Sequence, residues 1–368
     1  MNMQTQTTGF ESAVRDDAAR WKAKLEAKIH AGAQSAIGLL ERVQNDVPTD
    51  LVAKASAMTF SGADGFSMVL PKAGALKIHK HARSQIAARA GVPGAFLEEL
   101  STGSDWQRAC AADLLERHFI NGLGDQRHLV RHVRGEVRGF LSNRFRRLDN
   151  RPLLDTFVAA MDKAGAVAID GTYSDVRVAL KAVIPRVYMP LGSHEAVAYG
   201  IEWGNSDFGS AKHSIRVFLL RLWCLNGATM EDALAQVHLG RSLSEDIEFS
   251  DRTMQLDTAA SQSAMKDIVR GLLDARKIDA TMAGIKAAGE KGMTLAQLKS
   301  KVQKRLFAGE LKAVEEAWNT EDVAVLPTGD TAWRASNALS WVAKGIKDAD
   351  RKLEVERLAG VILNGKDD

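Results

Sequence analysis

Arginines are concentrated in one short stretch of this 368-residue chain, from Arg127 to Arg151. The eight are Arg127, Arg131, Arg134, Arg138, Arg144, Arg146, Arg147 and Arg151. Only Glu136 and Asp149 oppose them, so eight positive and two negative charges leave a net charge of +6. The planar guanidinium group suits bidentate contacts with phosphate oxygens. The stretch is therefore a candidate surface for a polyanion.

Two aromatic residues, Phe140 and Phe145, lie among these arginines. Aromatic side chains beside a cationic track are what proteins use to bind the unpaired bases of a single strand. In a hairpin, alternate residues of each strand share a face, so the arginines can form a stripe. We expect single-stranded nucleic acid, DNA first of all, to bind here through phosphates on the arginines and bases on the phenylalanines. The alternative is a solvated strand face with a few internal ion pairs.

A second set of chemically capable residues consists of Asp175, Asp207 and His238. Their carboxylates and imidazole could serve a nuclease-like or nucleotide-processing enzyme, provided that all three meet in one pocket. His128 and His132 are four residues apart, but no third ligand follows at a suitable spacing, so we expect no metal site.

Signatures of common enzyme classes are absent from the sequence. It contains no phosphate-binding loop ending in Gly-Lys-Ser/Thr, no dinucleotide fingerprint, no Gly-x-Ser-x-Gly and no His-Glu-x-x-His. Active sites also assemble from distant residues, so catalysis stays open. The sequence nevertheless favours a binding protein that uses no cofactor.

The overall composition is that of a globular protein, with 45% hydrophobic and 26% charged residues. The net charge of +3 is too small to indicate a polyanionic partner by itself. Two widely separated cysteines, Cys110 and Cys224, fit a reducing compartment. The first ten residues do not resemble a secretory signal, and Arg216 and Arg221 interrupt the longest apolar run. We therefore expect a cytoplasmic protein of a bacterial host cell, without membrane contact.

Hydrophobic spacing and turn residues predict the elements that position these side chains. The N-terminal half should contain an amphipathic helix over residues 11–43, loosely broken at Gly32 and Gly38, a hairpin with strands 58–60 and 66–70, and helices over 80–90, 93–100 and 107–119. The arginine stretch should form strands 128–133 and 136–141, which turn at Arg134-Gly135. Asp149 or Asn150 should then cap a helix that ends at Lys163.

Three more strands are expected over residues 176–184, 195–203 and 215–223, and helices almost throughout after Ser250. We predict an α+β fold with a central, mainly antiparallel sheet, covered by helices on one face, and an all-helical C-terminal region. The expected organisation is an N-terminal helical arm (1–50), an α+β core with the basic hairpin (51–245) and a helical C-terminal region (246–368).

Four segments also resemble a known family. They are residues 86–96 (IAARAGVPGAF), 137–150 (VRGFLSNRFRRLDN), the turn at 205–209 (NSDFG) and 220–227 (LRLWCLNG). In order and spacing they resemble the phage- and plasmid-encoded proteins grouped as domain of unknown function 932, over residues 55–360. The resemblance implies a phage, prophage or plasmid origin, and the family has no established catalytic residues to transfer. Since mobile elements often encode replication and recombination proteins, single-strand binding or annealing is the expected activity, by analogy.

A protein-interaction or structural module of a phage is the other function that the sequence allows. In that case the N-terminal amphipathic helix and the C-terminal helices would assemble homo-oligomers or contact a host protein. The arginines would then only decorate the surface.

Overall fold

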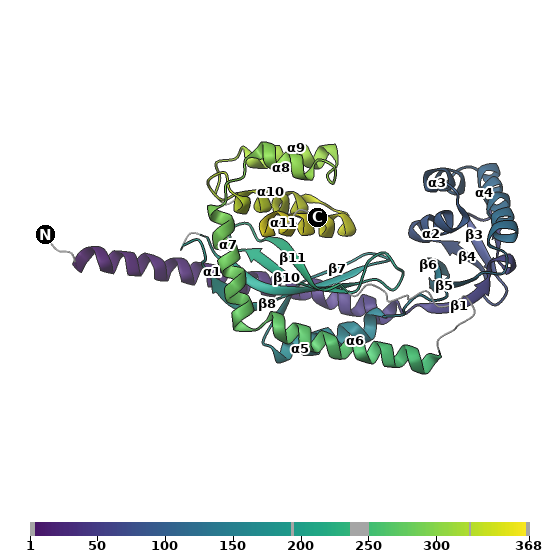
Figure 1. Cartoon of the computed structure of the whole chain (residues 1–368), viewed down its shortest axis with the longest axis horizontal. Coiled ribbons are helices and arrows are strands. Elements are labelled where there is room, and N and C mark those ends of the chain that lie inside the picture. The colour runs from purple at the N-terminus through teal and green to yellow at the C-terminus, as the bar shows by residue number, and fades with distance from the viewer. Residues whose placement is uncertain (1–3, 193–194, 236–249, 324, 366–368) are drawn as a thin grey trace.

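The computed structural model describes residues 4–192, 195–235, 250–323 and 325–365, and it contains two β-sheets with helices packed on both (Figure 1). In chain order the elements are α1 (Gln4–Asn45), β1 (Thr49–Lys54), a 3-10 turn (Ala55–Ala57), β2 (Thr59–Ser61), β3 (Ser67–Leu70), β4 (Gly74–Ile78), α2 (Lys80–Ala90), α3 (Gly94–Thr102), α4 (Asp105–His118), a π turn (Phe119–Leu123), β5 (Arg127–Val133), β6 (Glu136–Ser142), α5 (Asn150–Lys163), β7 (Val167–Tyr173), β8 (Val178–Tyr188), β9 (Val197–Asn205), β10 (Ser214–Arg221), β11 (Asn226–Ala235), α6 (Asp251–Leu272), α7 (Ala275–Glu290), α8 (Leu295–Val302), α9 (Ala308–Trp318), α10 (Ala332–Gly345) and α11 (Ala349–Asn364).

The first sheet has six strands in the order β1-β5-β6-β4-β3-β2. Its pairs are antiparallel except β4 with β6, which run parallel. The predicted hairpin β5–β6 is present, and Arg134 (φ 49°) and Gly135 (φ 80°) form its turn in the left-handed region, as a two-residue hairpin turn requires. Helices α2, α3 and α4 bury Ile86, Leu97 and Leu115 in the same core as Val130 and Phe140 of the hairpin.

The second sheet has five antiparallel strands in the order β11-β10-β9-β8-β7. Helix α1 buries Trp21 against Ala198 and Phe218 on one face. On the other face, the hydroxyl of Tyr199 donates to the Leu272 carbonyl at the end of α6. The expectation that helices cover only one face is therefore wrong. Both faces of β9 and β10 are buried, so each face needs its own covering layer.

The N-terminal helix is continuous, so the predicted breaks at Gly32 and Gly38 are absent. A glycine inside a helix costs only about 1 kcal/mol, which the packing of α1 on the sheet can offset. Gly32 also has a packing role, because a Cβ atom there would stand 1.8 Å from the Ile169 carbonyl oxygen of β7. The absence of a side chain at this position lets helix and strand approach closely.

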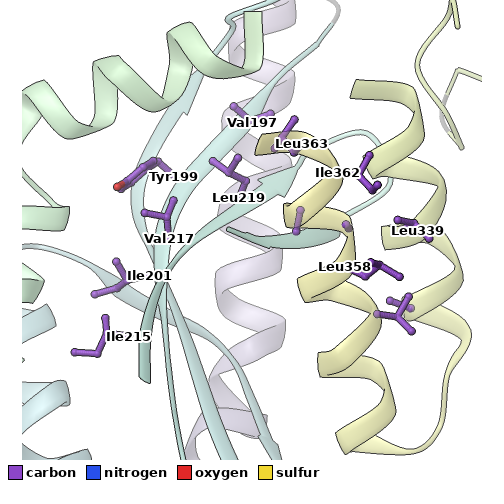
Figure 2. Close-up of a cluster of buried hydrophobic side chains, with 14 of the residues drawn as sticks. Val197, Tyr199, Ile201, Ile215, Val217, Leu219, Leu339, Leu358, Ile362 and Leu363 are labelled. Atoms are coloured by element: carbon purple, nitrogen blue, oxygen red, sulfur yellow. The ribbon is translucent and has the colours of Figure 1, made fainter. Parts of the chain in front are cut away.

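The described residues after Ser250 form only helices, α6 to α11. Together with the two sheets they confirm the α+β class. These helices do not form a core of their own. Figure 2 shows Val197, Tyr199 and Leu219 of the second sheet in one buried cluster with Leu358 and Ile362 of α11. The boundary expected near residue 245 thus does not separate two hydrophobic cores. None of the helices within the described ranges combines the length and the apolar character needed to cross a membrane.

Candidate functional site

Arg131 in the middle of β5 is buried, with only 1% of its surface exposed. Its Nε donates to Asp50 at 2.7 Å, Nη2 donates to Asp149 at 2.7 Å, and Nη1 donates to the Asp207 carbonyl at 2.8 Å. These partners come from β1, the start of α5 and the loop after β9. The expectation that Arg131 contacts a phosphate is corrected here, because its guanidinium already joins the two sheets in the interior.

Two further residues of the expected nucleic-acid surface are also interior. Arg138 is buried and pairs with Asp46 at 2.9 Å and with Glu136 at 3.1 Å. Phe140 is 1% exposed, and its ring stacks on His128 at a centroid distance of 4.7 Å. A base cannot stack on a ring that the core already covers. Arg138 and Phe140 therefore leave the predicted set together with Arg131.

Three other arginines of the stretch lie nearer the surface but pair with carboxylates far away in the sequence. Arg146 binds Asp257 of α6 and also donates to Ser261, Arg147 lies 3.2 Å from Asp50, and Arg134 lies 3.2 Å from Asp46. For these three arginines, the structure shows the internal ion pairs that we gave as the alternative to a nucleic-acid surface.

Besides Arg127 and Arg144, Phe145 and Arg151 are the remaining residues of the stretch that make none of these contacts. Phe145 is partly buried, whereas Arg151 is exposed at the start of α5 and makes no ion pair with any residue in the described ranges. Neither is placed beside the cavity described next.

Arg127 and Arg144 line one cavity of about 660 Å³ on the six-stranded sheet. Because β5 and β6 are antiparallel, the start of one strand lies beside the end of the other, with His128 opposite Ser142. The end of α2 adds Arg89, which the sequence interpretation had missed. We call this site the arginine cavity, and its lining residues are Arg89, Leu123, Asp125, Gln126, Arg127, His128, Ser142, Asn143 and Arg144.

His128 is the buried polar side chain of this lining, with 2% of its surface exposed. Neither ring nitrogen has a hydrogen-bond partner of good geometry among the described residues. Burial, and to a lesser degree the Arg89 charge, lowers the pKa of His128 to about 4, and the Leu141 carbonyl opposes both more weakly. The imidazole is therefore neutral at physiological pH.

The lining contains one carboxylate, that of Asp125. It accepts hydrogen bonds from Lys54 at 3.0 Å and Ser56 at 3.3 Å, and these contacts hold the pKa of Asp125 below its usual value. Arg89 and Arg144 form no ion pair with any residue that the structure describes. The arginine cavity is thus a polar hollow with three guanidinium groups and a carboxylate that Lys54 already binds.

Asp175 and Asp207, two of the three residues that a nuclease-like enzyme would use, do not line the arginine cavity. Asp207 lies in the loop after β9 and is buried against the start of α5. Its carboxylate accepts from the Asn150 backbone N–H at 2.7 Å and from the Asn150 side chain at 2.8 Å. Burial raises the pKa of Asp207 to about 7. Asp175 is half-exposed and pairs with Arg42 at 2.5 Å. His238 lies outside the described residues. The two carboxylates thus connect segments that are distant in the chain, and neither lines the arginine cavity.

In the described ranges, no three His, Cys, Asp or Glu side chains are placed to hold a metal ion.

Comparisons of the chain with protein-family models, with curated proteins and with solved structures return no match. The resemblance to domain of unknown function 932 therefore stays a prediction from the sequence.

Proposed function

We propose that this chain binds single-stranded nucleic acid, DNA in the first place, and that the phosphates of the strand enter the arginine cavity. One observation carries the proposal: Arg89, Arg127 and Arg144, from three separate segments, line one hollow whose carboxylate is bound by Lys54. Guanidinium groups are the side chains best suited to phosphate oxygens. A role in phage-type replication or recombination, such as annealing, follows from the family resemblance and belongs to the same proposal.

The neutral polar groups of the cavity support a nucleotide ligand further. Gln126 and Asn143 carry side-chain amides, and Ser142 carries a hydroxyl, so the lining offers donors and acceptors to a base edge or a sugar. Leu123 adds an apolar wall. The volume of about 660 Å³ lies within the range of about 300–1,000 Å³ that is typical of small-ligand sites. The cavity is therefore large enough to hold a part of a strand, rather than one ion.

The salt dependence of binding tests this function. Binding of a fluorescent single-stranded oligonucleotide should weaken with a log-log slope of roughly −0.7 for each phosphate neutralised, or about −2 for three arginines. Arg144→Ala should make the slope shallower by about 0.7 and weaken binding similarly for all sequences. Arg276→Ala on α7 is the matched control, because its side chain is exposed and does not line the cavity, and it should leave the slope unchanged.

Absence of salt-sensitive binding to single-stranded DNA or RNA at low micromolar concentration would exclude the proposed function. So would unchanged binding by a folded variant with alanine at Arg89, Arg127 and Arg144. The protein-interaction function would then take its place. Its support is the large exposed apolar surface of Trp106 (69%) and Phe96 (48%) on neighbouring helices α4 and α3.

A further inference from the structure

The loop of residues 206–210 follows β9 of the second sheet but is bound by elements of the first. The Phe208 carbonyl accepts from Gln85 Nε2 of α2 at 2.9 Å and lies 3.0 Å from Nε2 of His81 on the same helix. The Phe208 ring is 3% exposed and packs with Val133 of β5. We call residues 206–210 the docking loop, because through them the second sheet contacts both α2 and the hairpin of the first sheet.

The docking loop is held in one shape on the side of the second sheet. The hydroxyl of Ser206 donates to the Val176 carbonyl at 2.6 Å. The same oxygen accepts from the backbone N–H groups of Phe208 at 3.1 Å and Ser210 at 3.0 Å. Because these bonds close the loop around one buried side chain, it can hold its partners in the first sheet at fixed positions.

Gln85 connects the docking loop to β6 as well as to α2. Its Nε2 donates to the loop, and its Oε1 accepts from the Phe140 backbone N–H at 2.7 Å. Since a carbonyl only accepts and a backbone N–H only donates, the two partners fix the orientation of the side-chain amide. Ile86 and Ala90 of α2 pack in the adjacent core, but apolar packing is non-directional, whereas hydrogen bonds set distances. Gln85 therefore holds α2, β6 and the loop in one register.

The two elements that Gln85 joins carry lining residues of the arginine cavity. Arg89 lies one helical turn after Gln85 on α2, and Arg144 lies two residues beyond the end of β6. The docking loop also packs on β6, since a Cβ atom at Gly209 would lie 2.8 Å from Leu141 Cδ2. No carboxylate among the described residues pairs with Arg89 or Arg144. The relative position of their guanidinium groups therefore depends on the elements that carry them.

We infer that the docking loop, acting through Gln85, holds Arg89 and Arg144 at the spacing at which both contact one nucleic-acid strand. Gln85 does not line the arginine cavity, so it is a positioning residue and not a ligand contact. A preorganised site binds more tightly, because the cost of ordering it is not paid on binding. The second sheet thereby controls the affinity of a site built on the first. This inference rests on the proposed function and adds a control of the same site.

Methionine in place of Gln85 has a similar length and lacks the amide, so Gln85→Met tests the inference. Binding of a fluorescent single-stranded oligonucleotide by the folded variant should weaken about fivefold, and the log-log salt slope should become shallower by about 0.7, although no charge is removed. The slope changes because a displaced Arg89 no longer neutralises a phosphate. A merely structural role of Gln85 leaves the slope as in the wild type, and an unchanged slope overturns the inference.

A double-mutant cycle with Arg89→Ala identifies the arginine that Gln85 positions. In the Arg89→Ala background, Gln85→Met should weaken binding by less than about twofold, because the arginine that it would displace is absent. Equal effects of Gln85→Met in both backgrounds overturn the inference while the proposed function stands. Failure of the wild-type protein to bind single-stranded DNA or RNA removes the proposed function itself.

Gln262→Met on α6 is the matched control. Gln262 is partly buried like Gln85, and its Nε2 donates to the Pro152 carbonyl at 3.0 Å and to Thr156 Oγ1 at 2.9 Å. Neither partner lines the arginine cavity, so affinity and slope should be those of the wild type. Weaker binding with a shallower slope in this variant as well would assign the effect to lost stability and contradict the inference.

Should Gln85→Met not fold, Gly209→Ala tests the same contact from the second sheet. The added Cβ atom would lie 2.8 Å from Leu141 Cδ2 and 3.4 Å from Gln85 Nε2, so this variant should bind the strand several-fold more weakly. Gly329→Ala is its control, because the two glycines have φ values of 77° and 78°, and a Cβ atom at Gly329 would meet Thr331 Cγ2 at an ordinary 3.7 Å. Wild-type affinity in folded Gly209→Ala contradicts the inference.

Discussion

At the scale of single residues, burial lowers the pKa of His128, and the lowered pKa predicts how the stability of the protein depends on pH. Its pKa is about 4 in the folded chain and 6.5 in the unfolded chain. Between these values the unfolded chain binds the proton and the folded chain does not, so stability is lost as the pH falls from about 6.5 towards 4. The loss from this group amounts to at most about 3 kcal/mol. Urea unfolding at about pH 7.5 and about pH 5, on either side of the unfolded-state pKa, measures it.

His128→Gln separates this contribution from the acid sensitivity of other groups. The variant should lose less stability than the wild type between the two pH values, because glutamine does not titrate. Identical pH dependence in His128→Gln and the wild type would contradict the assignment of a depressed pKa.

At the scale of elements, the contact between α1 and β7 depends on Gly32. Alanine at an ordinary helical position gains about 1 kcal/mol over glycine. A Cβ atom added at Gly32, however, would stand 1.8 Å from the Ile169 carbonyl oxygen. Gly32→Ala should therefore destabilise the protein by about 1–3 kcal/mol, as overpacking does. Gly38→Ala in the same helix meets no atom within 4 Å and should be neutral or stabilising. Thermal unfolding of both variants tests this, and equal effects of the two substitutions would refute it.

At the scale of the whole molecule, Arg131 connects the two sheets. It binds Asp50 in β1 of the first sheet, Asp149 at the start of α5, and the Asp207 carbonyl in the loop that follows β9 of the second sheet. Arg131→Met would leave the buried Asp207 carbonyl and the partly exposed Asp50 and Asp149 carboxylates without their donor, and it should destabilise the chain by about 1–3 kcal/mol. Arg117→Met, which removes an exposed ion pair with Asp113 on α4, should cost less than about 1 kcal/mol.

Calorimetry shows whether Arg131 also couples the two halves. The two sheets have largely separate hydrophobic cores, so unfolding of Arg131→Met should split into two heat-absorption peaks, while the wild type should show greater overlap. A single unshifted peak in the variant would show that other contacts hold the sheets together.

Much of the local structure was predictable from the sequence, because its determinants are close together along the chain. Helix α2 has the expected bounds, and Arg134-Gly135 forms the hairpin turn. Asp149 occupies the expected N-cap position of α5, but its side chain accepts from Arg131 and makes no cap hydrogen bond. Capping, turn chemistry and hydrophobic spacing act over a few residues. Strands β1, β4, β7 and β11 were missed. β1 and β4 carry mostly exposed or half-buried residues, and β1 pairs with β5, which lies far along the chain.

The sequence by itself determined that arginines gather between Arg127 and Arg151, and only the tertiary structure decided what each of them does. Arg131, Arg138 and Arg146 are bound by Asp50, Asp46 and Asp257, residues that lie 81, 92 and 111 positions away in the chain. Arg127 and Arg144 line one cavity together with His128 of β5 and Arg89 of α2. Charge along a chain is a property of composition, whereas the availability of a charge depends on which carboxylates the fold brings within hydrogen-bonding distance.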